Sequence, residues 1–171
     1  DWVDVCAPGV DVHSHYVPRG WPDLAAECGG SGWPSLRVDS ATEAMIMLGT
    51  NDLKERFSVN AGDIALSLER LVRVIRTSGA GPGGAAPGVL LVAPPPILET
   101  GCLASMFAGG AAKSLQLATE IEAAATRSGV AFLDAGRIVK VSPVDGIHYE
   151  AEANAPLAQA LAEAVRRHFP A

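Results

Sequence analysis

The chain has 171 residues, of which 49% are hydrophobic and 19% charged, and its mean hydropathy is +0.22. This length is typical of a single domain with a core large enough to fold unaided. The net charge of −6 and the lack of Lys or Arg clusters argue against a nucleic-acid or anionic-membrane partner, because phosphates require basic groups to neutralise them.

Residues 9–18 begin with the period-two pattern of a strand, which leads to His13 and His15. Alternate residues of a strand point to the same side, so these two imidazoles could hold a divalent metal together. A catalytic zinc needs about three protein ligands, and the other histidines, His148 and His168, lie far along the chain. We therefore favour histidines that bond backbone or solvent, and we expect no metal and no cofactor.

Residues 44–48 form a short apolar run of strand length, which ends at Gly49. Catalytic polar groups in open α/β sheets gather beyond the carboxyl ends of the strands. Asn51 is therefore a candidate donor to an oxyanion, with Gly49 as a loop residue beside it. The alternative is a simple turn in which the Asn51 amide bonds its own backbone.

Helices and strands are expected to alternate through the rest of the chain. Apolar residues at helical spacing predict one helix around 64–75 and another over 113–127, which Gly129 caps. Their apolar stripes are Ile64, Leu68, Leu71, Val72 and Ile75 in the first helix, and Leu115, Leu117 and Ile121 in the second. Arg70, Arg73 and Arg76 are interpreted as the solvent-facing edge of the first helix.

Buried strands are predicted at 89–92 and 130–133, and a final helix at about 151–168. Strands that alternate with helices indicate a mainly parallel sheet covered on both faces. The long loop 97–110 is partly apolar and either lines a substrate pocket or packs against another subunit. The apolar residues of this loop are Leu98, Leu103, Met106 and Phe107.

Near the end of the chain, Asp145 and His148 are three residues apart. On a tight turn the carboxylate can orient the imidazole and stabilise its cationic form, which makes His148 a candidate general base. A plain surface turn would be the favoured interpretation if the pair stood alone.

In order and spacing, residues 44–168 resemble the SGNH (GDSL-type) hydrolases, and within them the bacterial aryl-esterase and acyltransferase branch. The likeness rests on Met45 to Asp52 with Lys54, Asp63 to Leu66, Val89 to Pro96, Phe107 to Gly110, and Val144 to His148. It implies a three-layer, flavodoxin-like α/β sandwich, N-terminally shortened, that forms one domain over 1–171 with 1–43 as an atypical segment. It also implies a Ser nucleophile, an oxyanion hole that includes Asn51, and the base pair Asp145 and His148.

The expected Gly-Asp-Ser block is absent from the sequence. We favour Ser14 as the nucleophile, because it follows a strand pattern as the nucleophile of the family does. Ser40 has the better Asp-Ser dipeptide, but it lies too close to the next strand for a crossover helix between them.

Residues 8–40 instead resemble the first strand region of the metal-dependent amidohydrolases, in the branch that contains aminocarboxymuconate-semialdehyde decarboxylase. The likeness rests on the segment around His13 and His15 and on two Gly-Trp-Pro motifs. The chain thus reads as an amidohydrolase-like beginning joined to an SGNH-like body.

The sequence therefore predicts an esterase that acts on small acyl or aryl esters, with acyl transfer to alcohols as a possible side activity. Its rivals are a metal-dependent hydrolase or decarboxylase that uses His13 and His15, and a catalytically impaired oligomeric scaffold. The high apolar content favours a homo-oligomer. No apolar stretch is long enough to span a bilayer and no signal-peptide pattern is present, so we expect a cytoplasmic protein.

Overall fold

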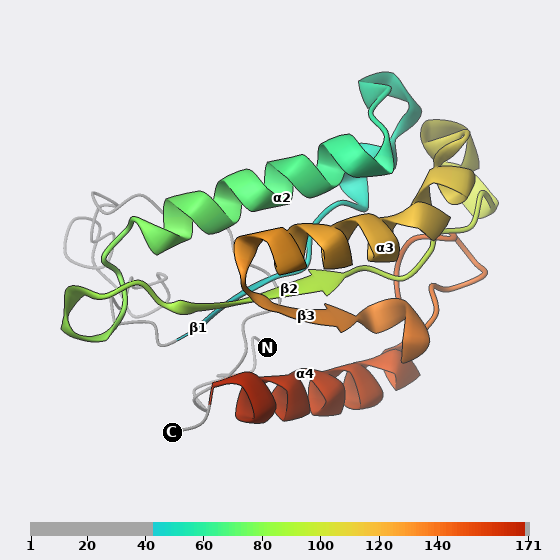
Figure 1. Cartoon of the computed structure of the whole chain (residues 1–171). Helices are drawn as coiled ribbons and strands as arrows, with labels where there is room; N and C mark the ends of the chain where they lie inside the picture. The colour runs from blue at the N-terminus through green and yellow to red at the C-terminus, as the bar shows by residue number, and fades with distance from the viewer. Residues whose placement is uncertain (1–42, 170–171) are drawn as a thin grey trace, which may run out of the picture.

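A computed structural model describes residues 43–169. These residues contain a sheet of three parallel strands in the order β1, β2, β3. The strands are β1 (Glu43–Ile46), β2 (Gly88–Ala93) and β3 (Ala131–Asp134). Glu43 pairs with Gly88 at one end of the first ladder, and Leu90 pairs with Ala131 in the second. All three strands point the same way, so their carboxyl ends share one edge of the sheet (Figure 1).

Helices cover both faces of this sheet. The helices α2 (Ala61–Arg76) and α3 (Gly110–Ser128) lie together on one face, and α4 (Asn154–His168) lies on the other (Figure 1). The predicted three-layer α/β sandwich with a parallel sheet is therefore confirmed. Short 3₁₀ turns occupy the connections; they are Asn51–Leu53, Glu55–Phe57, Pro82–Gly84, Gly101–Phe107, Ala135–Arg137 and Ala151–Ala153.

The central strand β2 explains how two cores form. Successive side chains of a strand point to opposite faces, and both faces of β2 are buried. Val89, Leu91 and Ala93 pack with the α2 and α3 side, whereas Leu90 and Val92 pack with the α4 side. This is why the 89–92 run is continuously apolar rather than alternating.

The helix α2 begins with a capping box. The Asn60 side chain accepts the Asp63 amide at 2.9 Å, and the Asp63 carboxylate accepts the Asn60 amide at 3.4 Å. Ile64, Leu68 and Val72 are buried as predicted. Leu71 does not belong to the buried stripe, because it is 40% exposed.

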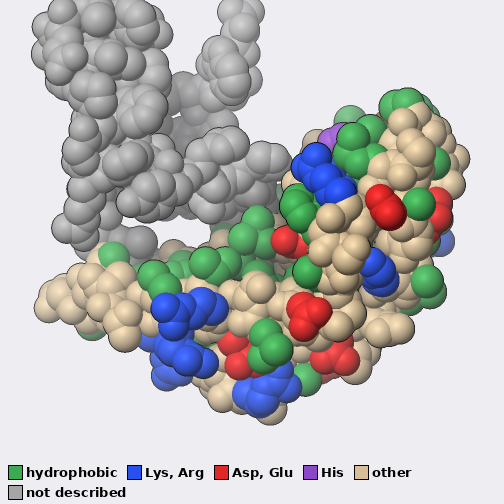
Figure 2. Space-filling model, turned by 90° about the horizontal axis from the view of Figure 1, so that it is seen from above, with side chains coloured by type: hydrophobic (Ala, Val, Ile, Leu, Met, Phe, Trp, Pro, Cys, Tyr) green, Lys and Arg blue, Asp and Glu red, His purple; other side chains and the backbone are tan. Residues whose placement is uncertain are grey.

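The surface of α2 and α3 is mixed in charge. Arg70, Arg73 and Arg76 are exposed, as expected for the solvent-facing edge. Arg127 on α3 donates from Nε to Glu69 Oε1 on α2 at 2.8 Å, which links the two helices. Seen from above, several basic side chains gather on one part of the described surface with acidic ones beside them, and hydrophobic side chains are scattered over the rest (Figure 2).

The helix α3 begins at Gly110, three residues before the predicted start, and Gly129 ends it with φ +62°. Leu117 and Ile121 are fully buried, but Leu115 is 70% exposed, so its predicted place in the apolar stripe is wrong. Two residues correspond to about 200° around a helix, so Leu115 and Leu117 face nearly opposite directions. In the part of the chain that the structure describes, no helix is long and apolar enough to cross a membrane.

Candidate functional site

Three segments meet at the carboxyl edge of the sheet. Residues 47–54 follow β1, residues 94–107 follow β2, and residues 135–150 follow β3. In open α/β sheets, ligands bind in the crevice outside this edge. The predicted residues Asn51 and His148 lie in the first and third of these segments.

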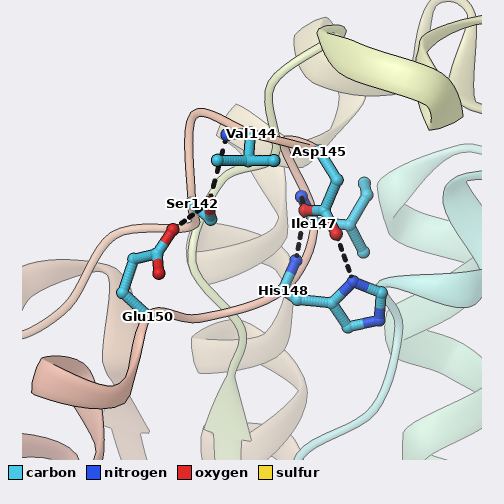
Figure 3. A network of polar contacts seen from close by, with 6 residues as sticks. All are labelled: Ser142, Val144, Asp145, Ile147, His148 and Glu150. Atoms are coloured by element: carbon cyan, nitrogen blue, oxygen red, sulfur yellow. Dashed lines mark hydrogen bonds and ion pairs between the residues drawn. The ribbon is translucent and has the colours of Figure 1, made fainter.

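The Asp145 carboxylate makes three hydrogen bonds, two with His148 and one with Ile147 (Figure 3). Asp145 Oδ2 lies 2.5 Å from His148 Nδ1. Asp145 Oδ1 accepts the amide of Ile147 at 2.9 Å and the amide of His148 at 3.0 Å. The carboxylate therefore orients the imidazole and also closes the backbone turn that carries it.

These contacts lower the pKa of Asp145 from 3.8 to about 2. The hydrogen bond from His148 contributes most, followed by the backbone amides of Ile147 and His148. Donors stabilise the charged form of a carboxyl group. Asp145 is thus an anion at neutral pH, positioned behind an imidazole whose side chain is 74% exposed.

The loop that carries this pair is packed against the loop after β2, backbone to backbone. The Leu98 amide donates to the Gly146 carbonyl at 2.9 Å. Gly146 has φ +77°, and a Cβ there would lie 2.1 Å from the Leu98 oxygen. A Cβ on Gly101, with φ +66°, would lie 2.0 Å from the Val144 oxygen. Both contacts therefore require glycine.

Two residues without a predicted role, Ser142 and Glu150, close the base of the same loop. The Ser142 hydroxyl donates to Glu150 Oε1 and accepts the Val144 amide at 3.1 Å (Figure 3). The Ser142-Pro143 sequence could have indicated the bond to the Val144 amide, because Ser side chains often accept the backbone amide two residues on. Nothing in the sequence indicated that Glu150 would be its partner.

Gly49 and Asn51 form a tight turn after β1. Gly49 is buried with φ +118°, and its carbonyl accepts the Asp52 amide at 3.2 Å. Asn51 is exposed at the first position of a 3₁₀ turn, and no described residue hydrogen bonds its side chain. The alternative in which the Asn51 amide bonds its own backbone is therefore not seen, and within 43–169 the amide has no hydrogen-bond partner.

The four apolar residues of the loop after β2 are divided between core and surface. Phe107 is 2% exposed and packs in the core, with Lys54 Nζ 5.7 Å from its ring centroid, so it does not line a pocket. Leu103 is partly buried against the same core. Leu98 and Met106 are 46% and 45% exposed and remain available for contact.

A large hollow in the described structure lies far from these residues. Its volume is about 710 Å³, and it is lined by Gly88, Val89, Ala131 and Phe169 among others. Gly88 and Ala131 begin β2 and β3, so the hollow lies at the amino ends of the strands, opposite the edge that carries Asp145. The hollow and the Asp145–His148 pair therefore lie at opposite ends of the sheet.

Four of the predicted residues, His13, Ser14, His15 and Ser40, fall outside the described residues. Within 43–169, no group of three His, Cys, Asp or Glu side chains could hold a metal ion. The structure therefore brings the predicted base and its carboxylate together, and it leaves the nucleophile as a prediction.

No family model matches the chain. Its structure is similar to Est24, a carbohydrate acetylesterase from Sinorhizobium meliloti, with 38% sequence identity and a TM-score of 0.70. It is also similar to the aryl esterase of M. smegmatis, with 40% identity and a TM-score of 0.69. Each similarity covers 74% of this chain and 61% of the esterase, so the chain spans less than two thirds of their length.

A different likeness is found over a short stretch. Over 38 residues the chain is 42% identical to 2-amino-3-carboxymuconate-6-semialdehyde decarboxylase of Sus scrofa. The matched stretch is 22% of this chain and 28% of that protein. The amidohydrolase resemblance predicted for the N-terminal segment rests on this partial match. The esterase likeness is far more extensive, and the described part of the chain has the α/β fold of the SGNH-type hydrolases, as its sequence resemblance predicts.

Proposed function

We propose that the chain is a carboxylic ester hydrolase that acts on small acyl or aryl esters through a Ser-His-Asp mechanism. The observation that carries the proposal is the Asp145–His148 pair, with 2.5 Å between Oδ2 and Nδ1, in a fold shared with esterases. The imidazole Nε2 has no hydrogen-bond partner among residues 43–169, so it is free to take a proton from a nucleophile.

In this mechanism the Ser14 hydroxyl attacks the ester carbonyl while His148 accepts its proton. Asp145 stabilises the imidazolium that forms. The Asn51 amide, together with backbone amides near Gly49, donates to the oxyanion of the tetrahedral intermediate. His148 then protonates the departing alcohol, and water releases the acyl group in a second cycle; an alcohol in place of water gives acyl transfer.

The apolar part of the ester is proposed to contact a hydrophobic rim on the loops at the carboxyl edge of the sheet. Five exposed large hydrophobic residues lie in the loops of the carboxyl edge; they are Leu48, Phe57, Leu98, Met106 and Val144. The same rim would also support association into the homo-oligomer predicted from the sequence. Light scattering of the purified chain, with and without a Val144→Asp substitution, tests that association. Cytoplasmic location stays a prediction from the sequence.

The mechanism is tested with a fluorophosphonate, which labels activated serines, followed by peptide mass spectrometry. We expect one adduct, on Ser14, that is absent in His148→Ala. An adduct on Ser40 would assign the nucleophile to Ser40 in place of Ser14. Ester turnover without any serine adduct would contradict the mechanism. Turnover that survives His148→Ala would also contradict it.

The decarboxylase match favours a second candidate, a metal-dependent hydrolase or decarboxylase that uses His13 and His15. This candidate predicts that a chelator abolishes activity and that zinc restores it. The esterase mechanism predicts that neither treatment changes ester turnover, so one experiment separates the two.

A further inference from the structure

Ser142 is the point at which the loop carrying the base is tied to itself. Its amide donates to the His148 carbonyl at 2.6 Å, and its carbonyl accepts the Gly146 amide at 2.9 Å. Its hydroxyl accepts the Val144 amide at 3.1 Å and donates to Glu150 Oε1. Ser142 thus contacts every second residue from 144 to 150. Figure 3 draws its two hydroxyl contacts beside the Asp145–His148 pair.

The Glu150 carboxylate is the acceptor that lets the Ser142 hydroxyl stay buried. Ser142 is only 5% exposed, so its hydroxyl proton has little access to water. A buried donor that loses its acceptor is destabilised, and a bond to a charged acceptor is stronger than a neutral one. Without Glu150, the hydroxyl must turn to another acceptor or the loop must open to water.

The position of the His148 ring depends on this closure. The ring is largely exposed, and among the described residues only Asp145 bonds it. Asp145 is held in turn by backbone amides 147 and 148. The carbonyl of His148 is bound by Ser142. A shift of Ser142 therefore changes the backbone that sets the Oδ2 to Nδ1 distance.

We propose that Glu150 is a positioning residue of the active site, which acts through Ser142 to hold His148 at the angle required for proton transfer. It does not contact the substrate. This inference rests on the proposed ester hydrolysis. Misplacement of a reacting group by about 1 Å can cost as much as 100-fold in rate, so a partial release of the loop is expected to show in kcat.

The test uses Glu150→Ala and Glu150→Gln with a p-nitrophenyl ester. We expect Glu150→Ala to lower kcat by roughly tenfold or more with little change in KM, because substrate contacts are untouched. Glu150→Gln keeps an acceptor oxygen for the Ser142 hydroxyl and should restore most of the activity. Glu152→Ala is the matched control: Glu152 is an exposed carboxylate two residues away that no described residue bonds, and its loss should leave kcat unchanged.

A second readout does not require turnover. Carbon-13 NMR titration of the Asp145 carboxyl group should give a pKa of about 2 in the unaltered chain. In Glu150→Ala the pKa should rise toward 3.8, because the three donors move away from the carboxylate. Equal kcat and an equal Asp145 pKa in Glu150→Ala would overturn the inference. If the unaltered chain hydrolyses no ester, the proposed function fails, and the NMR pKa alone decides whether Glu150 positions the pair.

Discussion

Gly146 lies against the carbonyl oxygen of Leu98 so closely that a Cβ there would be 2.1 Å from that oxygen. The same two residues share a hydrogen bond of 2.9 Å from the Leu98 amide to the Gly146 carbonyl. The turn between Asp145 and His148 is therefore packed directly against the loop that follows β2. The site depends on two loops that are about 50 residues apart in the sequence.

Gly146→Ala is expected to lower both stability and ester turnover. The substitution adds a clash to an unfavourable positive φ, and each strained residue costs about 1–3 kcal/mol. Chemical denaturation measures the first effect and kcat the second. Gly109→Ala is the control, because Gly109 has a similar φ of +75° but nothing within 4 Å of the added carbon. If both variants lose the same stability and activity, the contact with Leu98 is unimportant.

Asp145→Asn should reduce kcat by about 10⁴-fold, the effect of replacing the carboxylate of such a triad by an amide. The amide cannot stabilise the imidazolium, although it can still accept backbone amides 147 and 148. Asp134→Asn is a close control, because Asp134 also accepts an amide two residues on and pairs with a cation three residues on. It should change kcat by no more than about twofold. Ester hydrolysis assays that measure kcat for both variants make this comparison.

The Asp145 contacts should also make stability depend on pH in the acid range. The pKa of Asp145 is about 2 in the folded chain against 3.8 for the free group. Because the folded value is the lower one, the contribution is fully present above the unfolded pKa and is lost as the pH falls from about 4 through about 2. Thermal unfolding of the unaltered chain and of Asp145→Asn should differ most at pH 5 and converge near pH 2. A constant difference over that range would contradict the assignment.

Asn51→Ala should lower kcat by roughly 10²–10³-fold, as the loss of one oxyanion donor does. It should leave stability almost unchanged, since the Asn51 side chain is exposed and makes no hydrogen bond with any described residue. Asn60→Ala should show the opposite pattern, because Asn60 caps α2 and its loss costs about 1 kcal/mol. Measuring kcat and denaturation midpoints for both variants separates the two roles; an Asn51→Ala enzyme of full activity would exclude the oxyanion role.

The two leucines of α3 should differ sharply in their contribution to the core. Leu117→Ala removes a fully buried side chain and should destabilise the fold by about 2–5 kcal/mol. Leu115→Ala changes a side chain that is 70% exposed and should lie within about 0.5 kcal/mol of the unaltered chain. Urea denaturation of the pair measures both values, and equal losses would mean that Leu115 is covered in solution.

Much of the fold follows from local patterns in the sequence. The apolar run at 89–92 predicted a buried strand, and Gly129 marked the end of α3 within one residue. The prediction that Leu71 and Leu115 belong to the buried faces of their helices was wrong. Helical spacing alone does not show which apolar residues contact another layer of the fold.

The sequence by itself determined the parallel α/β sandwich and the proximity of Asp145 to His148, since both depend on periodicity and short spacing that local sterics impose. Only the tertiary structure decided how the pair is held. Gly146 meets Leu98 where two separate loops lie together at the sheet edge, and Phe107 is buried in the core. The bond from Ser142 to Glu150 closes one loop across eight residues. Contacts of this kind depend on the packing of the layers, and no local pattern encodes them.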